Sequence, residues 1–311
     1  MIGRADIGAA HARIGSYIRK TPVLALAADD LGFGHPVTLK LEQLQLTGSF
    51  KVRGAFSNLL GQTLPAAGVV AISGGNHGAA VALAATRLGV KSVVFVPGMI
   101  ANEVKIARMR GFGAEVRVVE GSVDDAFASY DDHARQTGAV AVHPYDSVET
   151  VAGQGTIGLE LEEQMPDIDT VLVAVGGGGL IGGIAAWFAG GVKVVAVETE
   201  GTSSLDKTLR DTLPKNFRVS GISASGLGAS SIGTIPIGII RAHVAENVVV
   251  SDADVIEAQR RLWDATRMVC EPGGVTALAA LTAGAYRPRA GERVAVLLCG
   301  GNAEPGWFTG G

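Results

Sequence analysis

Residues 170–188 read TVLVAVGGGGLIGGIAAWF, and this stretch decides the class of fold. TVLVAV is a continuous apolar run of strand length, and LIGGIAAWF is an apolar segment of helical length. Four glycines, Gly176 to Gly179, separate the two segments. A strand, a glycine turn and a helix in this order form one unit of a parallel sheet that is covered on both faces. The sequence therefore predicts an α/β protein.

The same alternation continues in both directions from this unit. We predict strands at residues 37–42, 69–72, 92–96, 115–119, 139–142, 170–175, 192–197 and 293–299. We predict helices at 49–60, 76–88, 102–110, 124–137, 154–165, 180–189, 252–269 and 275–286. Segment 201–247 has few long apolar runs and many glycines and serines, so we expect a loop-rich surface excursion there. The pattern predicts two lobes, each with three αβα layers, and a cleft between them.

Composition excludes several classes of protein. The 311 residues are 47% hydrophobic and 18% charged, which is typical of a compact globular chain. The net charge of −4 comes without a basic tract, so we expect no nucleic-acid partner. The long uncharged run at 170–192 divides into strand, loop and helix, so we expect no membrane span. Two cysteines and an N-terminal segment interrupted by charges favour a reducing compartment, and we expect the cytoplasm.

The four glycines after the strand carry the first chemical signal. A glycine loop lets the backbone curl around an anion, and the following helix start supplies free N–H groups and a positive dipole end. The loop therefore predicts a phosphate site, with a tight packing turn as the plainer alternative. Gly177, Gly179 and Gly182 also satisfy G-x-G-x-x-G, and Glu198 ends the next strand. That pattern is typical of dinucleotide binding, so an NAD(P)-dependent oxidoreductase stays open at this point.

Other polar motifs adjoin predicted strand ends. They are TGSFKVRGA at 47–55, which contains Lys51, SGGNHG at 73–78, EPGG at 271–274 and CGGN at 299–302. Each combines glycines with a polar group suited to a planar phosphorylated ligand. In α/β proteins such turns meet where ligands bind, outside the carboxyl ends of the strands.

Together with VGGGGLIGG at 175–183, these motifs resemble the pyridoxal 5'-phosphate (PLP) enzymes of the tryptophan-synthase β fold, also called fold type II. Within that fold the sequence is similar to the threonine/serine dehydratase and serine racemase branch. The resemblance covers residues 21 to about 303. It implies parallel-rich sheets with the cofactor in the interdomain cleft. It also implies a large PLP-binding domain of residues 1–57 and 143–311 and a small substrate-loop domain of residues 58–142.

The resemblance implies which residues bind the cofactor. Lys51 would hold PLP as a Schiff base and later move the α-proton of the substrate, and Phe50 would pack near the cofactor ring. Asn76 would hydrogen-bond the 3'-oxygen of PLP, and Cys299 would face its pyridine nitrogen. The phosphate would lie on the backbone of Gly176, Gly177, Gly178 and Gly179.

The substrate loop follows from the same resemblance. Ser73, as a catalytic and substrate-binding residue, would hold the substrate carboxylate together with the backbone of Gly74, Gly75, Asn76 and His77. The His77 side chain is more typical of a loop-shaping group than of an acid–base group. Outside the loop, Glu271 is equally consistent with a helix cap and with a site residue.

A cation site is the last implication. Some relatives bind a cation through acidic residues that follow the strand after the glycine loop. Glu198 matches the first ligand and Thr202 is the second candidate, for Mg²⁺ or another cation. The family's second acidic ligand would fall near Ser204, which is not acidic, although Asp206 lies close by.

The resemblance also points to a reaction. We expect a dehydratase, or ammonia-lyase, that converts a β-hydroxy amino acid such as L-threonine or L-serine to a 2-oxo acid and ammonia. In the racemases of the family a serine stands where this chain has Gly74, so an amino-acid racemase is the second hypothesis. A thiol at Cys299 holds a protonated pyridine nitrogen poorly, which favours loss of a β-leaving group. A homodimer with an amino-acid substrate is expected from the family alone.

Overall fold

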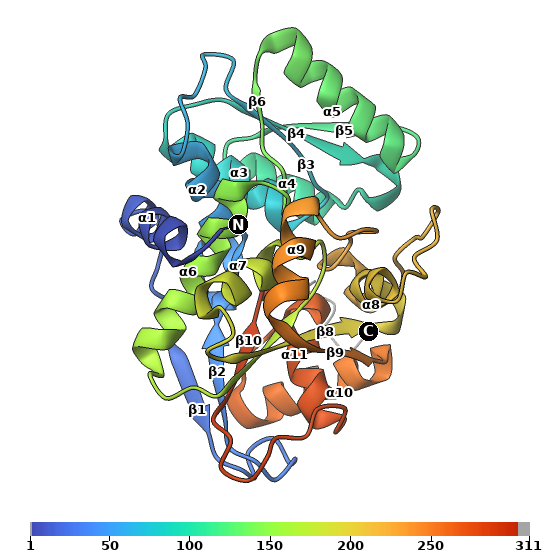
Figure 1. Cartoon of the computed structure of the whole chain (residues 1–311). Helices are drawn as coiled ribbons and strands as arrows, with labels where there is room; N and C mark the ends of the chain where they lie inside the picture. The colour runs from blue at the N-terminus through green and yellow to red at the C-terminus, as the bar shows by residue number, and fades with distance from the viewer. Residues whose placement is uncertain (1, 304–311) are drawn as a thin grey trace.

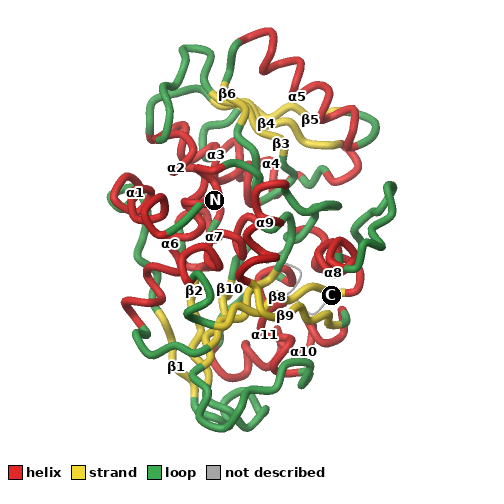
Figure 2. The backbone as a smooth tube through the Cα atoms, viewed as in Figure 1, coloured by secondary structure: helices red, strands yellow, loops and turns green. Residues whose placement is uncertain are grey.

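A computed structural model describes residues 2–303 of the chain. It has two parallel-rich sheets, each covered by helices, and the smaller sheet lies above the larger one in Figure 1. Figure 2 shows the strands as two separate groups with helices around them. The α/β fold with two parallel-rich sheets is therefore confirmed.

The larger sheet has the strand order β1-β2-β10-β7-β8-β9. Its strands are β1 (Val23–Leu26), β2 (Val37–Leu41), β7 (Thr170–Ala174), β8 (Lys193–Thr199), β9 (Val244–Val250) and β10 (Val294–Leu298). Within this sheet β1 pairs with β2 in antiparallel fashion, and the other neighbours are parallel. The last strand of the described chain, β10, is thus a central strand, between β2 and β7.

The smaller sheet has the order β5-β4-β3-β6, and its neighbours are all parallel. Its strands are β3 (Val69–Ile72), β4 (Ser92–Pro97), β5 (Glu115–Val119) and β6 (Val140–Ala141). The domain ranges given above stay a prediction. The boundary between residues 57 and 58 falls inside a helix that packs against neighbours on both sides.

The helices, in chain order, are α1 (Arg4–Ile14), α2 (Lys51–Leu60), α3 (Asn76–Arg87), α4 (Glu103–Gly111), α5 (Val123–Thr137), α6 (Val148–Gln164), α7 (Gly179–Phe188), α8 (Ser204–Leu209), α9 (Thr234–His243), α10 (Asp252–Thr266) and α11 (Pro272–Thr282). Serine side chains begin several of them. Ser122, Ser147 and Ser251 each accept a hydrogen bond from a backbone N–H in the first turn of α5, α6 and α10. None of the helices in residues 2–303 is both long and apolar enough to span a lipid bilayer.

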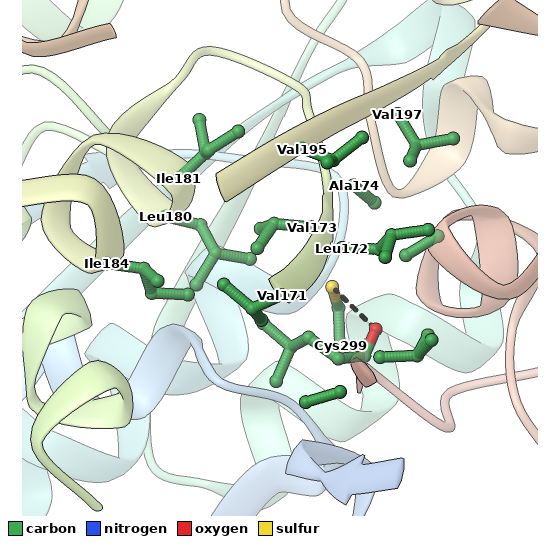
Figure 3. Close-up of a cluster of buried hydrophobic side chains, with 14 of the residues drawn as sticks. Val171, Leu172, Val173, Ala174, Leu180, Ile181, Ile184, Val195, Val197 and Cys299 are labelled. Atoms are coloured by element: carbon green, nitrogen blue, oxygen red, sulfur yellow. Dashed lines mark hydrogen bonds between the residues drawn. The ribbon is translucent and has the colours of Figure 1, made fainter. Parts of the chain in front are cut away.

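The core explains why the chain has so many continuous apolar runs. Strands β7 and β10 are buried at every position, as is the whole of α7. Figure 3 shows side chains of β7, α7 and β8 in one cluster, where Val173 lies next to Leu180 and Leu172 lies on the other side, near Ala174. Strands covered on both faces need apolar side chains on both, which produces runs without alternation.

Segment 201–247 is more regular than predicted. It contains α8, α9 and the beginning of β9, so the expectation of a loop-rich excursion was wrong for about half its length. Pro236 and Gly238 obscure α9 in the sequence, although a proline in a first helical turn is tolerated. The sequence pattern predicted no element at α1 or β1, and α6 begins at Val148, six residues before the expected start.

Candidate active site

Lys51 begins α2, and its Nζ atom donates a hydrogen bond of 2.8 Å to the carbonyl oxygen of Pro144. The side chain is half-buried, and burial lowers the pKa of its amine to about 8. The Phe50 ring lies beside it, with its centroid 5.1 Å from Nζ. No carboxylate among the described residues forms an ion pair with this amine. About a tenth of the amine is therefore neutral at pH 7, far more than at its ordinary pKa, and the neutral form is the one that attacks aldehydes and accepts protons.

The predicted phosphate loop connects β7 to α7. Gly178 has a φ of +90°, a left-handed conformation that favours glycine. A Cβ on Gly177 would lie 2.3 Å from the Tyr145 ring, and a Cβ on Gly179 would lie 2.7 Å from the Tyr145 carbonyl oxygen. Glycine is thus required for contact with Tyr145 as well as for the turn. The N–H groups at the start of α7 are the donors that a helix of this length offers to an anion.

One dipeptide links the lysine to the glycine loop. The carbonyl of Pro144 accepts the Lys51 amine, and the next residue, Tyr145, packs on Gly177 and Gly179. His143 completes the segment, because its Nδ1 accepts hydrogen bonds from the backbone N–H groups of Tyr145 and Asp146. Segment 143–146 therefore places the predicted Schiff-base lysine and the predicted phosphate loop on its two sides.

Asn76 begins α3 at the carboxyl end of β3 and has partners from two distant segments. Its Nδ2 donates to Glu271 Oε1 at 2.6 Å, and its Oδ1 accepts from Asn302 Nδ2 at 2.6 Å. The Glu271 carboxylate makes no capping hydrogen bond to α11. Of the two roles considered for Glu271, side-chain capping of the helix is therefore not observed. Burial raises the pKa of Glu271. The motifs 73–78, 271–274 and 299–302 thus meet at one amide side chain.

In the rest of the predicted substrate loop, the polar side chains contact backbone groups of the protein. Ser73 Oγ accepts a hydrogen bond from the N–H of Gly75 at 3.1 Å. His77 is buried, its Nε2 lies 3.0 Å from the Val142 carbonyl oxygen, and burial lowers its pKa to about 3. The imidazole is therefore neutral and donates to that carbonyl. A Cβ on Gly74 would lie 2.9 Å from Ile100 Cδ1, so an apolar side chain covers the loop at that point.

Cys299 directly follows β10, beside the beginning of α2. The Phe50 N–H donates to the Cys299 carbonyl oxygen at 3.1 Å, and the Gly301 N–H donates to the Gly48 carbonyl oxygen at 2.9 Å. The thiol is buried at the edge of the apolar cluster in Figure 3, and burial raises its pKa, so it is neutral. Lys51 acts electrostatically on Cys299 and on His77, so these two predicted residues lie near its amine.

The residues predicted to bind a cation are hydrogen-bonded to groups of the protein itself, and their role stays a prediction. Glu198 is fully buried, and its two carboxylate oxygens accept the backbone N–H groups of Leu205 and Asp206 at 2.7 and 2.8 Å. Thr202 Oγ1 pairs with the Thr199 hydroxyl at 2.9 Å. No group of three acidic, histidine or cysteine side chains in residues 2–303 is placed to hold a metal ion. Glu198 is also turned toward these amides, which leaves little support for its alternative role as a ribose ligand.

Three residues of the site were missed in the sequence. Pro144 and Tyr145 lie in a segment without a glycine motif, so their contacts with Lys51 and the glycine loop had no signal of their own. Asn302 stands in the quoted CGGN motif but received no role, and it bridges Asn76 and the Thr47 carbonyl.

The side chains present fit PLP. A half-buried amine without an acidic partner suits the aldehyde, and a glycine loop at a helix start suits the phosphate. The amide of Asn76 is a donor suited to the ring oxygen, and the neutral thiol of Cys299 suits an unprotonated ring nitrogen.

Comparison with known proteins places the chain in a family. Residues 14–300 match the family described as pyridoxal-phosphate dependent enzyme. The chain is 36% identical to a phenylserine dehydratase of Ralstonia pickettii over 308 residues, which cover 97% of this chain and 94% of that protein.

Two solved structures superpose closely. Maize serine racemase gives a TM-score of 0.91 at 30% identity and covers 99% of this chain and 96% of its own. A bacterial threonine deaminase, from T.th., gives a TM-score of 0.91 at 35% identity and covers 97% of this chain and 99% of its own. Dehydratases and racemases are thus similarly related to it. The chain belongs to the pyridoxal-phosphate dependent enzymes of fold type II, in the branch of amino-acid dehydratases and racemases.

Proposed function

We propose that this protein is an ammonia-lyase that converts a β-hydroxy amino acid, such as L-threonine or L-serine, to a 2-oxo acid and ammonia. The observation that carries the proposal is the environment of Gly74. Proton transfer at both faces of an α-carbon needs an acid–base group on each face. The substrate loop offers one face no side chain at Gly74, and the Cδ1 and Cγ1 atoms of Ile100 cover that position. Lys51 is then the one proton-moving group, which suits elimination.

The chain's own residues divide the work of the reaction. When bound, PLP supplies the electron sink that makes the substrate α-proton acidic. Lys51 Nζ accepts that proton, and its lowered pKa of about 8 leaves neutral amine available. The N–H groups of the loop that begins at Ser73 bind the substrate carboxylate, and Asn76 orients the ring through its side-chain amide. Loss of the β-hydroxyl gives an enamine, which water hydrolyses to the 2-oxo acid and ammonia without an oxidant.

Electrostatics at the ring nitrogen support the same reaction. The buried Cys299 thiol is neutral and carries no charge that would hold a proton on that nitrogen. A ring without that proton withdraws electrons less strongly. Prompt loss of a leaving group is then favoured over slower chemistry at the α-carbon.

The first test is a panel of substrates. The PLP-loaded enzyme is incubated with L-threonine, L-serine and L-threo-3-phenylserine, and 2-oxo acid and D-amino acid are both measured. We expect 2-oxo acid with little D-amino acid from at least one of the three. Rapid formation of D-serine with little pyruvate would contradict the proposal and favour a racemase.

Gly74→Ser, alone and with Ile100→Ala, is the second test. The single variant brings a side chain against Ile100, whereas the double variant makes room for the hydroxyl. We expect D-serine formation to rise more in the double variant than in Gly74→Ser alone. Equal racemisation in all variants would show that position 74 does not decide the outcome.

Two further proposals rest on the family and the sequence. We propose that the enzyme forms a homodimer and that it works in the cytoplasm, where its two free cysteines stay reduced. Sedimentation of the purified holoenzyme should give twice the chain mass of 31.7 kDa, and a monomer would contradict the first. A tagged copy of the full chain should fractionate with the cytoplasm, and recovery elsewhere would contradict the second.

A further inference from the structure

Four charged side chains form a buried cluster beside the N-terminal turn of α2. They are Lys40, Glu42, Arg53 and Glu160, and their side chains are 0 or 1% exposed. We call them the Arg53 cluster. Two cations and two carboxylates make the cluster neutral. Burying four charges is costly unless each is paired and hydrogen-bonded, so this arrangement needs an explanation.

The hydrogen bonds of the cluster use the forked shape of Arg53. Its Nε and Nη2 atoms donate to the two oxygens of Glu42, both at 2.8 Å. Its Nη1 and Nη2 atoms donate to the two oxygens of Glu160 at 2.7 and 2.9 Å. Nη1 also donates to Thr156 Oγ1 at 3.1 Å. A lysine has no planar fork and cannot make two bidentate pairs at once.

The cluster fastens three elements together. Glu42 directly follows β2, Arg53 lies on α2, and Glu160 lies on α6. The two helices touch next to it, because a Cβ on Gly153 would lie 2.7 Å from the Arg53 carbonyl oxygen and 2.9 Å from the Gly54 Cα. At this contact the backbones of α2 and α6 are adjacent. A shift of α2 along α6 would break both the contact and the bidentate pairs.

Both partners of the Lys51 hydrogen bond depend on these helices. Lys51 precedes Arg53 by two residues on α2, and the Pro144 carbonyl that accepts its amine stands shortly before α6 begins at Val148. The position of the amine therefore follows the position of α2 on α6. The titratable groups that act on Lys51, or on which it acts, are Cys299, His77 and His143, none of which belongs to the cluster.

We propose that Arg53 is a positioning residue, which locks α2 onto α6 so that the Lys51 amine stays on the Pro144 carbonyl and out of water. The inference rests on the proposed role of Lys51 for its meaning in catalysis. It adds a residue that touches neither cofactor nor substrate but determines how reactive the lysine is. A merely structural Arg53 would change stability and leave Lys51 reactivity unchanged.

The test measures the amine directly. Full-length protein freed of PLP is given a trace of acetic anhydride at a series of pH values, and mass spectrometry quantifies acetylation of the Lys51 peptide. Only the neutral amine reacts, so the midpoint of the curve reports its protonation. Wild-type protein should give a midpoint of about 8. The variants are Arg53→Lys and the milder Thr156→Val, with Leu59→Ala, a buried residue of α2 outside the cluster, as matched control.

We expect Arg53→Lys to raise the midpoint by about one pH unit, because a loosened α2 lets water reach the amine. At pH 7.5 this corresponds to an acetylation rate lower by about 5- to 10-fold. Thr156→Val should raise the midpoint by a few tenths of a unit. Leu59→Ala should lower the melting temperature but leave the acetylation midpoint unchanged. If Arg53→Lys does not fold, Thr156→Val decides. An unmoved midpoint in whichever of the two folds overturns the proposal, as does an equal shift in Leu59→Ala.

Failure of the proposed function would look different. Wild-type protein that forms no Lys51-dependent absorbance band at about 415 nm with PLP would contradict the cofactor role of Lys51. The acetylation comparison would still decide whether Arg53 controls the amine.

Discussion

Lys51 and Arg53 stand two residues apart on the same helix, and their side chains face opposite electrostatic conditions. Arg53 is fully buried between two carboxylates; burial opposes its charge, but pairing with both carboxylates outweighs burial and raises its pKa. Lys51 has a carbonyl oxygen as its hydrogen-bond acceptor, and burial lowers its pKa to about 8. The same helix thus carries one cation that stays charged and one amine that readily loses its charge.

The difference teaches how reactivity is separated from stability in this molecule. Loss of hydration opposes the charged form of either group, and only nearby opposite charge offsets that cost. The two acids, Glu42 and Glu160, are placed at Arg53, and no carboxylate in residues 2–303 forms an ion pair with Lys51. The helix is therefore stabilised through one residue while the desolvation of the other leaves a neutral nucleophile.

The largest expected effect is the loss of chemistry at Lys51. Lys51→Ala should lower formation of 2-oxo acid by at least about 10³-fold, because it removes the nucleophile and the base together. The absorbance band of the lysine–PLP Schiff base should disappear as well. Circular dichroism should stay that of the folded protein. Substantial turnover in this variant would contradict the role of Lys51.

Breaking the paired side of the comparison should destabilise the fold. Arg53→Met leaves the buried Glu42 carboxylate without its paired cation and Glu160 with Lys40 alone, and it should lower the free energy of unfolding by about 3–5 kcal/mol. Arg4→Met is the matched control, since Arg4 pairs with Glu162 at the surface with both side chains well exposed. Arg4→Met should lower the free energy of unfolding by less than about 1 kcal/mol. Urea unfolding measures both, and equal losses would show that burial of the Arg53 cluster is unimportant.

Removing the unpaired charge of Lys51 should raise the free energy of unfolding instead of lowering it. Lys51→Met should stabilise the PLP-free protein by up to about 3 kcal/mol at pH 7, because the wild-type chain must desolvate or deprotonate its amine on folding. The folded pKa of about 8 lies below the ordinary value of 10.5, so the unfolded chain binds more protons between these values. The stability of the wild-type protein should therefore rise between about pH 8 and pH 10.5, and the difference in stability between Lys51→Met and wild type should disappear. Urea unfolding at pH 7 and pH 10 tests this, and a destabilised variant at pH 7 would contradict it.

Glu271 supplies the smallest effect and an intermediate case. It is buried and accepts the Asn76 amide, and burial raises its pKa above the ordinary value. Glu271→Gln keeps an oxygen for Asn76 and removes the charge, so stability should change by less than about 1 kcal/mol. The variant should gain relative to wild type as pH rises, because wild-type Glu271 must ionise in a buried position. Thermal melting at pH 5 and pH 8 measures the difference, and the reverse trend would show that ionised Glu271 is stabilised by its neighbours.

The sequence predicted strands better than it predicted contacts. Continuous apolar runs placed β3 at its observed bounds and β4 within one residue of them, because strands covered on both faces must be apolar throughout. The glycine motifs at 73–78, 271–274 and 299–302 do meet, through the hydrogen bonds of Asn76 with Glu271 and Asn302, since turns at strand ends converge in this class of fold.

What the sequence could not show is pairing between distant segments. In the sequence Arg53 is a charged residue two positions after Lys51, and charged residues at this spacing are typical of a solvated helix start. Its partner Glu160 lies 107 residues away, so the burial of both was not visible. The contact of Tyr145 with the glycine loop could not be predicted for the same reason, because the glycine motif does not indicate which distant residue packs against it.

The place of β10 in the larger sheet has a consequence for how the protein is made. Strands β1 and β2 join the rest of that sheet through β10, the last strand of the described chain to leave the ribosome. Until it is synthesised, β2 and β7 present unpaired edges, and the Cys299 carbonyl that receives the Phe50 N–H is absent. Lys51 is therefore translated long before β10, the strand that completes its surroundings. Until β10 has been made, the nascent chain carries the Lys51 amine without the surroundings that set its reactivity.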